Sequence, residues 1–174
     1  RVRIFLAEKG VEIPTVQVNL RIGEQLSDAF RKINPRCTVP VLELDDGTRL
    51  TDSLAICHYL ESKFPKPNLM GRDAREQALV MNWHEQIMTE GFLAGAEALR
   101  NYARGFADRA VTGPSNFAQI PALAERGKLR LEVFLSVLEE RLKLLEFLRV
   151  LVREIGTSAS TSHTACCNNG ICEV

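Results

Sequence analysis

The chain has 174 residues, of which 45% are hydrophobic and 25% charged, the proportions of an ordinary globular protein with one large domain or two small ones. Lys plus Arg and Asp plus Glu number 22 each, so no net field favours nucleic acid or an anionic membrane. No apolar run is long enough to cross a bilayer, which excludes a membrane-spanning helical protein.

The first fifty residues predict helices and strands in alternation. Residues 1–9 read as a helix that ends at Gly10, since their apolar positions recur at helical spacing. Residues 15–20 alternate between apolar and polar and predict a strand. Residues 24–33 predict a short helix that Asn34-Pro35 ends, because the residue before Pro disfavours helical backbone.

The stretch from Asn34 to Ile56 predicts a loop, a hairpin and a helix start. Residues 41–44 form a short apolar strand, Asp45-Asp46-Gly47 is a strong tight-turn signal, and residues 48–50 return as the partner strand. Thr51-Asp52-Ser53 then supplies cap oxygens for a helix that runs toward Phe64.

Two features of this stretch suit a small zwitterionic peptide. Val39-Pro40 heads a strand, where a cis bond is tolerated and the Val39 backbone is free to pair with an extended ligand. Asp52-Ser53 opens a helix, so its exposed N–H groups attract a carboxylate while Asp52 accepts from an ammonium. The plainer alternatives are a turn into a core strand and an ordinary helix cap.

Taken together, these motifs resemble the glutathione transferase family over about residues 1–142. The resemblance implies an α/β thioredoxin-like N-terminal domain and an all-α helical C-terminal domain, both incomplete here, with glutathione bound between them. The residues that carry the resemblance, in order, are Asn34-Pro35, Val39-Pro40-Val41-Leu42, Asp46-Gly47, Leu50-Thr51-Asp52-Ser53 and Ala55-Ile56.

The resemblance also implies which residues bind glutathione. Val39, ahead of Pro40, would pair its backbone with the cysteinyl part, and Asp52 and Ser53 would hold the γ-glutamyl end. The position before Val-Pro often carries Lys or Gln that reaches the glycyl carboxylate, but here it is Thr38, which is shorter and uncharged. Arg36 is the alternative contact at that end.

No thiol-activating residue is identified. In the family a Ser, Tyr or Cys lies in the loop between the first strand and the first helix, and this chain starts after both, so we expect a truncated form whose catalytic residue is unknown. One branch of the family is thought to use a water held by helical-domain residues, a role open to His84, Asn101 or Tyr102. His84 and Glu85 point about 100° apart on a helix and do not form a pair.

Two cysteines lie in the folded part. Cys37 stands in the binding loop, where it either forms a mixed disulfide with glutathione or is an ordinary loop residue. Cys57 reads as small core filler on the inner helix. The remaining three of the five cysteines crowd the C-terminal end, which is not the pattern of a secreted disulfide framework, so we expect a cytoplasmic protein.

The second half predicts long helices. We place the first domain at 1–64, a Pro-rich linker at 65–71 and the helical domain at 72–142. Asp73 caps a long helix in which Gly91 and Gly95 mark close packing or a bend, and a second begins near Ile120-Pro121. The predicted core face of the second helix is Leu123, Leu129, Val133, Phe134, Val137, Leu138 and Leu142.

After Leu142 the resemblance stops, and a shifted reading frame or alternative splicing would explain the change. Residues 143–155 predict an apolar helix suited to packing or aggregation rather than a membrane surface, since no basic cluster accompanies it. Residues 156–174 predict a disordered Cys/Ser/Thr-rich tail. A metal site from His163, Cys166, Cys167 and Cys172 is the alternative, although neighbouring cysteines share a tetrahedral site poorly, and we expect no metal.

By resemblance, the function is that of a detoxifying glutathione transferase. Glutathione is then the co-substrate, whose thiol is conjugated to a hydrophobic electrophilic small molecule, and the chain forms a homodimer without nucleic acid or membrane partners. The alternative is a non-catalytic module of the same fold that mediates protein interactions.

Overall fold

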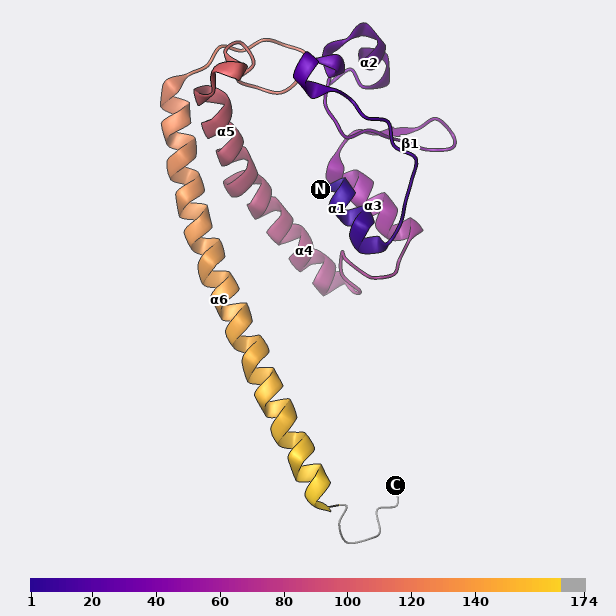
Figure 1. Ribbon diagram of the computed structural model, residues 1–174, viewed down its shortest axis with the longest axis vertical. Helices are drawn as coiled ribbons and strands as arrows, with labels where there is room; N and C mark the ends of the chain where they lie inside the picture. Colours follow the sequence, from indigo (N-terminus) through magenta and orange to yellow (C-terminus); the bar gives the residue numbers. More distant parts are fainter. Residues whose placement is uncertain (167–174) are drawn as a thin grey trace.

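The computed structural model describes residues 1–166, and the side chains of residues 1–146. The first part of the chain and the second form two neighbouring bodies, and α6 extends well beyond both (Figure 1). The first part contains α1 (Val2–Lys9), the 3-10 turns η1 (Leu20–Ile22) and η2 (Glu24–Leu26), α2 (Asp28–Ile33), β1 (Leu42–Glu43), β2 (Arg49–Leu50) and α3 (Ser53–Lys63). The second part contains α4 (Ala74–Gln86), the π-helical η3 (Ile87–Phe92), α5 (Leu93–Tyr102), the 3-10 turn η4 (Arg104–Phe106) and α6 (Pro121–Cys166).

The core of the first part lies between α1 and α3. Leu6 on α1 and Ile56 and Leu60 on α3 are buried together, and partly buried side chains from both helices and the hairpin surround them. Gly10 ends α1 in the left-handed region with φ of 64°, where its N–H bonds the carbonyl oxygens of the last turn. The predicted first helix and its glycine stop are therefore confirmed.

The predicted hairpin is confirmed, with strands of two residues each. β1 and β2 pair antiparallel with Leu42 opposite Leu50, and Leu44 N donates to Thr48 O at 2.8 Å. Gly47 occupies the turn with φ of 82°, which a side chain at Cβ would disfavour.

Two predictions for the N-terminal part are wrong. Residues 15–19 form no strand, because an extended segment counts as a strand only when a neighbour completes its ladder, and β1 pairs with β2 alone among the described residues. The single helix predicted over 24–33 is interrupted at Ser27. Its hydroxyl accepts from Phe30 N at 3.2 Å and so caps a new helix, α2.

The helical part is a two-helix layer in which α6 runs back along η3 and α5 (Figure 1). The small residues explain how closely the helices approach: a Cβ at Gly91 would lie 2.6 Å from the Phe134 ring, and one at Gly127 would lie 2.6 Å from Ala98 N. The close packing predicted at Gly91 is therefore confirmed, and the helix accommodates it with a π-helical turn.

Most of the predicted core face of α6 is not buried. Only Phe134 of that set is buried, because within the described residues α6 packs along one side against α5 and η3 and meets no further layer. Four of its apolar side chains are more than half exposed, namely Leu129, Val133, Val137 and Leu142.

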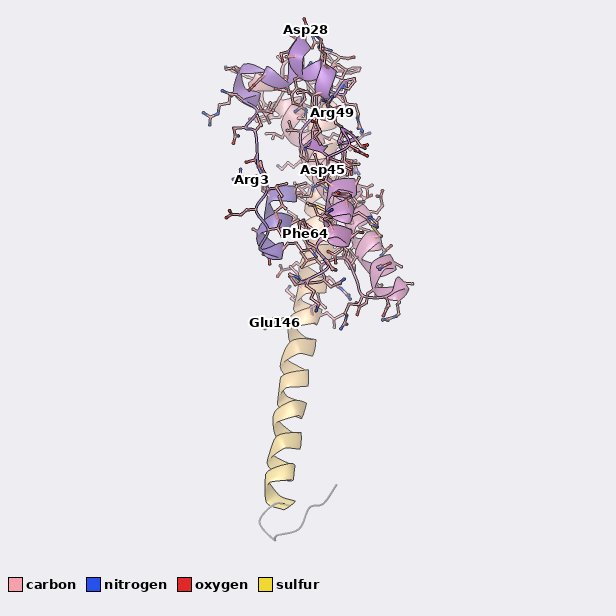
Figure 2. The ribbon with its side chains drawn as sticks, turned by 90° about the vertical axis from the view of Figure 1, so that its right-hand side faces the viewer. Arg3, Asp28, Asp45, Arg49, Phe64 and Glu146 are labelled. Atoms are coloured by element: carbon pink, nitrogen blue, oxygen red, sulfur yellow. The ribbon has the colours of Figure 1, made fainter. Side chains whose placement is uncertain are left out.

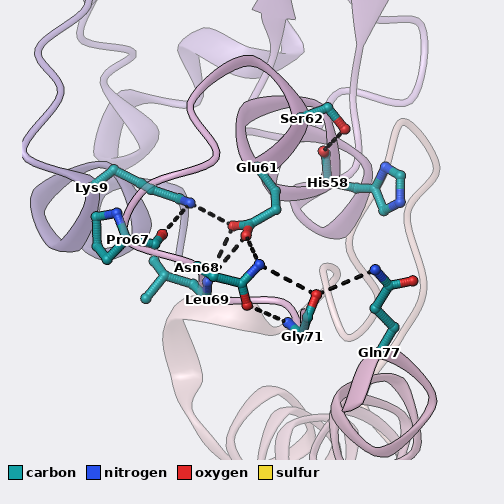
Figure 3. Close-up of polar contacts among 9 residues, drawn as sticks. All are labelled: Lys9, His58, Glu61, Ser62, Pro67, Asn68, Leu69, Gly71 and Gln77. Atoms are coloured by element: carbon teal, nitrogen blue, oxygen red, sulfur yellow. Dashed lines mark hydrogen bonds and ion pairs between the residues drawn. The ribbon is translucent and has the colours of Figure 1, made fainter. Parts of the chain in front are cut away.

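A buried polar network joins the two parts at the linker (Figure 3). Lys9 Nζ lies 2.6 Å from Glu61 Oε2 and donates to Pro67 O, and the Lys9 side chain has no exposed surface. Glu61 also accepts from Asn68 Nδ2 at 2.9 Å and from Leu69 N at 3.1 Å. Its carboxylate therefore ties α1 and α3 to the start of the second part.

The helix α6 continues to Cys166, past the point at which the sequence predicts a disordered tail. Once a helix has formed, each further residue adds one backbone hydrogen bond without a new nucleation cost. The Ser, Ala and Thr of 157–162 are compatible with this continuation. Residues 167–174, with two of the four predicted metal ligands, lie outside the described residues. No helix in the described part of the chain combines the length and apolar character that crossing a membrane requires.

Candidate functional site

The loop between α2 and β1 is held by one buried side chain. Asn34 is 1% exposed, and its Nδ2 donates to Thr38 O at 2.7 Å and to Thr38 Oγ1 at 3.1 Å. Its Oδ1 accepts from Arg36 N at 3.0 Å, and Cys37 N donates to Asn34 O at 2.9 Å. The sequence identified Asn34 as a helix end and as part of the family resemblance, and the structure adds that its side chain shapes the loop.

Val39 follows this loop and presents its backbone. Its peptide bond to Pro40 is cis, and 39% of the residue is exposed. Within the described residues, no hydrogen bond engages the N–H or the C=O of Val39. Both groups are thus available to an extended peptide that pairs with the chain as an added strand.

Asp52 and Ser53 lie at the N-terminal end of α3. Asp52 Oδ1 accepts from Leu54 N at 2.8 Å and from Ala55 N at 3.3 Å, so the predicted cap is confirmed. Asp52 Oδ2 and the Ser53 hydroxyl have no partner among the described residues, although Ser53 is only 9% exposed. This end of the helix can accept from an ammonium at Asp52 and donate to a carboxylate through the backbone N–H of Ser53, which has no acceptor among the described residues.

Thr38 and Arg36, the two residues predicted to contact the carboxylate at the other end of the ligand, differ in whether their polar groups are already engaged. The Thr38 carbonyl and hydroxyl oxygens are both engaged by Asn34, whereas the exposed guanidinium of Arg36 has no partner in the described part of the chain. Of the two candidates, Arg36 is the one with donors to spare for a carboxylate.

The two cysteines of the folded part are both buried. Cys37 is 3% exposed, with φ of 54° and its Sγ 3.7 Å from Pro35 O, so the structure favours an ordinary loop residue over a reactive thiol. Burial raises the pKa of the Cys57 thiol, as expected of a core residue. Weaker charge effects of Arg1, which lowers that pKa, and of Asp52, which raises it, also reach this thiol.

The three helical-domain residues predicted to hold a water differ in burial and in contacts. Asn101 is buried and structural, because its Nδ2 donates to Glu97 O and its Oδ1 accepts from Ile120 N. Tyr102 is largely exposed. His84 is half-buried and faces the first part of the molecule, with its Nε2 3.5 Å from Arg1 Nη1.

Arg1 makes a contact that the sequence does not predict. Its guanidinium lies over the Phe92 ring, 5.3 Å from the centroid, and its Nη1 also contacts Met88 Sδ. Met88 and Phe92 belong to η3, so Arg1 links the start of α1 to the π-helical turn. The nearest sequence signal was Gly91, which precedes Phe92 and was predicted to mark close packing or a bend.

Two hollows in the described surface lie away from Val39 and Ser53. One, of about 610 Å³, is open to solvent and lined by the linker and the first turns of α4. The other, of about 330 Å³, lies between η3 and α6 and is lined mainly by apolar side chains. Neither contains a residue of the predicted peptide site.

The chain is similar in sequence and in fold to known proteins. A family model described as glutathione S-transferase, N-terminal domain, matches residues 1–63. Glutathione S-transferase Z1 of Arabidopsis thaliana is 46% identical over 79 residues, which are 45% of this chain and 35% of that protein. Maleylacetoacetate isomerase of Mus musculus is 29% identical over 184 residues, covering 86% of this chain and 85% of that protein.

A crystal structure of a glutathione S-transferase domain-containing protein from Marinobacter aquaeolei VT8 has a TM-score of 0.70 and 34% identity. The match covers 80% of this chain and 66% of that one. The chain belongs to the glutathione transferase family, with zeta-class and maleylacetoacetate isomerase relatives. Its fold is a thioredoxin-like N-terminal domain followed by a helical C-terminal domain, as the resemblance implied. The matched region spans about a third of the Arabidopsis protein's length.

Proposed function

We propose that this chain binds glutathione at Val39, Asp52 and Ser53 and presents its thiol for conjugation to an electrophilic small molecule. Two observations together carry the proposal. The backbone N–H and C=O of Val39 have no partner among the described residues, and neither do Asp52 Oδ2 and the Ser53 hydroxyl at the start of α3. These groups complement the amide, ammonium and carboxylate of a γ-glutamyl peptide. The name that family members carry, glutathione S-transferase, supports the ligand.

Of the other predicted contacts, Pro40 fixes the direction of the strand and Thr38 fixes the loop through Asn34. Arg36, rather than Thr38, would then reach the glycyl carboxylate. The thiolate of the bound peptide is the nucleophile, so the protein contributes chiefly its position and environment.

Isomerisation is a second candidate reaction for the same site. It is favoured by the mouse relative, named maleylacetoacetate isomerase, since that match extends through most of both chains.

The proposed domain limits, 1–64 and 72–142, are compatible with the polar network at the linker between them. The exposed apolar side chains on α4, η3 and α5 support the homodimer that the family resemblance implies.

Replacing Asp52 with asparagine is expected to weaken glutathione binding about 10- to 100-fold, the value of a hydrogen bond to a charged group. Asparagine still caps the helix, so α3 remains formed while the partner of the ligand ammonium loses its charge. Isothermal titration calorimetry at neutral pH measures the change.

Asp73→Asn is the matched control, because Asp73 caps α4 in the same way by accepting from Glu76 N at 2.8 Å. It should leave the affinity for glutathione unchanged. Equal losses in both variants, or none in Asp52→Asn, would remove Asp52 from the site.

A further inference from the structure

The loop between α5 and α6 reaches across to the first part of the molecule, at the end that carries α2 (Figure 1). A Cβ at Gly113 would lie 3.8 Å from the backbone oxygen of Arg36, so this glycine lies against the loop between α2 and β1. Gly113 is buried, although its neighbours in the sequence are exposed. Residues 109–117, the strap, thus join the two parts separately from the linker network. Asp28 on α2 marks that end of the molecule in Figure 2, and Phe64, which precedes the linker, lies further along it.

The side chain of Arg109 holds the strap in shape. Its guanidinium donates to three acceptors within the strap, namely Gly113 O at 2.6 Å, Asn116 Oδ1 at 2.9 Å and Ser115 O at 3.3 Å. The strap is also tied to the end of α5, because Arg100 Nε donates to Ala110 O at 3.1 Å. One side chain of the helical part therefore fixes the position of Gly113, at which the strap meets the first part.

The strap in turn limits where Arg36 can lie. The backbone N–H of Arg36 donates to Asn34 Oδ1 at 3.0 Å, and Gly113 lies against its carbonyl oxygen on the other side of the residue. The guanidinium of Arg36 is exposed and has no partner in the described part of the chain. Its backbone is thus fixed while its donors stay available, which lowers the conformational entropy that is lost when they bind a carboxylate.

From this arrangement we propose that Arg109 is a positioning residue for the glycyl end of glutathione. It holds Gly113 against Arg36 and so places the guanidinium that binds the glycyl carboxylate. The inference rests on the proposed function, since it needs glutathione bound at the proposed site. It adds that a residue of the helical part sets the preference for the glycyl carboxylate without itself contacting the ligand.

The test compares glutathione with glutathione amide, a peptide of equal size in which a carboxamide replaces the glycyl carboxylate. Calorimetry should show that the wild-type chain binds glutathione about tenfold or more tightly than the amide. Arg36→Gln should reduce that ratio to about one. Arg109→Gln should reduce it to about threefold or less and leave the affinity for the amide as in the wild type, because the γ-glutamyl end is held elsewhere.

Arg104→Gln is the matched control, because Arg104 lies in the same loop and its exposed side chain makes no hydrogen bond or ion pair with the described residues. It should leave the ratio as in the wild type. Gly113→Ala is a second variant, since a side chain at φ of 126° strains the strap at its contact with Arg36 without changing any charge. It should lower the ratio as Arg109→Gln does.

A loss of equal size for both peptides in Arg109→Gln would assign Arg109 a general structural role and overturn the inference, and so would an equal fall of the ratio in Arg104→Gln. If Arg109→Gln binds neither peptide, Gly113→Ala decides, and a ratio unchanged there overturns the inference. Equal affinities of the wild type for the two peptides contradict this inference alone. Binding of neither peptide by the wild type contradicts the proposed function and the inference with it.

Discussion

Glu61→Leu is expected to lower the free energy of unfolding by about 3–5 kcal/mol, which is the cost of removing one partner of a buried ion pair. The Lys9 side chain has no exposed surface, and after the change its ammonium keeps the Pro67 carbonyl and the Phe5 ring as neighbours but has no anionic partner among the described residues. The backbone N–H of Leu69 loses its acceptor as well, and the Asn68 amide keeps only its longer bond to Gly71 O at 3.3 Å. For a chain of this size the melting midpoint should fall by roughly 10 °C, measurable by circular dichroism.

The double variant Lys9→Met/Glu61→Leu separates this cause from a general loss of packing. Removing both charges should restore much of the stability, because no uncompensated charge stays buried. The exposed pair of Arg49 Nε and Glu43 Oε2, 2.7 Å apart, is the control for a surface interaction. Glu43→Leu should change stability by less than about 1 kcal/mol. A loss in Glu61→Leu no larger than the loss in Glu43→Leu would show that the linker network does not hold the two parts together.

Gly127→Ala should destabilise the chain by about 1–3 kcal/mol, even though alanine favours helices over glycine by about 1 kcal/mol. A Cβ at Gly127 would lie 2.6 Å from Ala98 N and 2.7 Å from Ala94 O, and backbone atoms of α5 cannot move aside as a flexible side chain would. The helices α5 and α6 must therefore separate, and the contact that fixes the helical part is lost. Chemical denaturation, with the midpoint and slope both recorded, measures the effect.

Gly95→Ala is the matched control on the facing helix. Its Cβ would meet only Leu131 Cδ2 at 3.6 Å, an ordinary contact distance, so the helix propensity of alanine should prevail and stability should rise by up to about 1 kcal/mol. If both variants stabilise the chain to the same extent, the prediction that α5 and α6 lie too close at Gly127 to admit a Cβ is wrong.

The local elements of the first part were predictable because their signals are short-range. Gly10, Gly47 and Asp52 each fix one turn or cap, and a single residue type is sufficient for each. The proposed peptide site rests on signals of the same kind, since Val39 and Asp52 belong to one continuous stretch of chain, and it stays a prediction.

Long-range contacts were not predictable from the residues. The alternating pattern of 15–20 predicts a strand but carries no information about a neighbouring strand with which to pair. Likewise, the apolar stripe of α6 predicts a buried core face. Burial depends on how many helices surround the stripe, and in the described part of the chain α6 packs against α5 and η3 on one side. The Lys9–Glu61 pair and the Arg1–Phe92 contact join residues 52 and 91 positions apart, distances at which no sequence period carries information.

The melting midpoint with and without glutathione tests the central claim, that the Val39, Asp52 and Ser53 site binds this peptide. At a hundred times its dissociation constant, a ligand of the folded state adds about 2.7 kcal/mol, which raises the midpoint by several degrees. The dipeptide cysteinylglycine, which lacks the γ-glutamyl end that Asp52 and Ser53 would hold, should raise it far less. A cooperative melt that millimolar glutathione shifts upward is the predicted result, and a midpoint that glutathione leaves unchanged would contradict it.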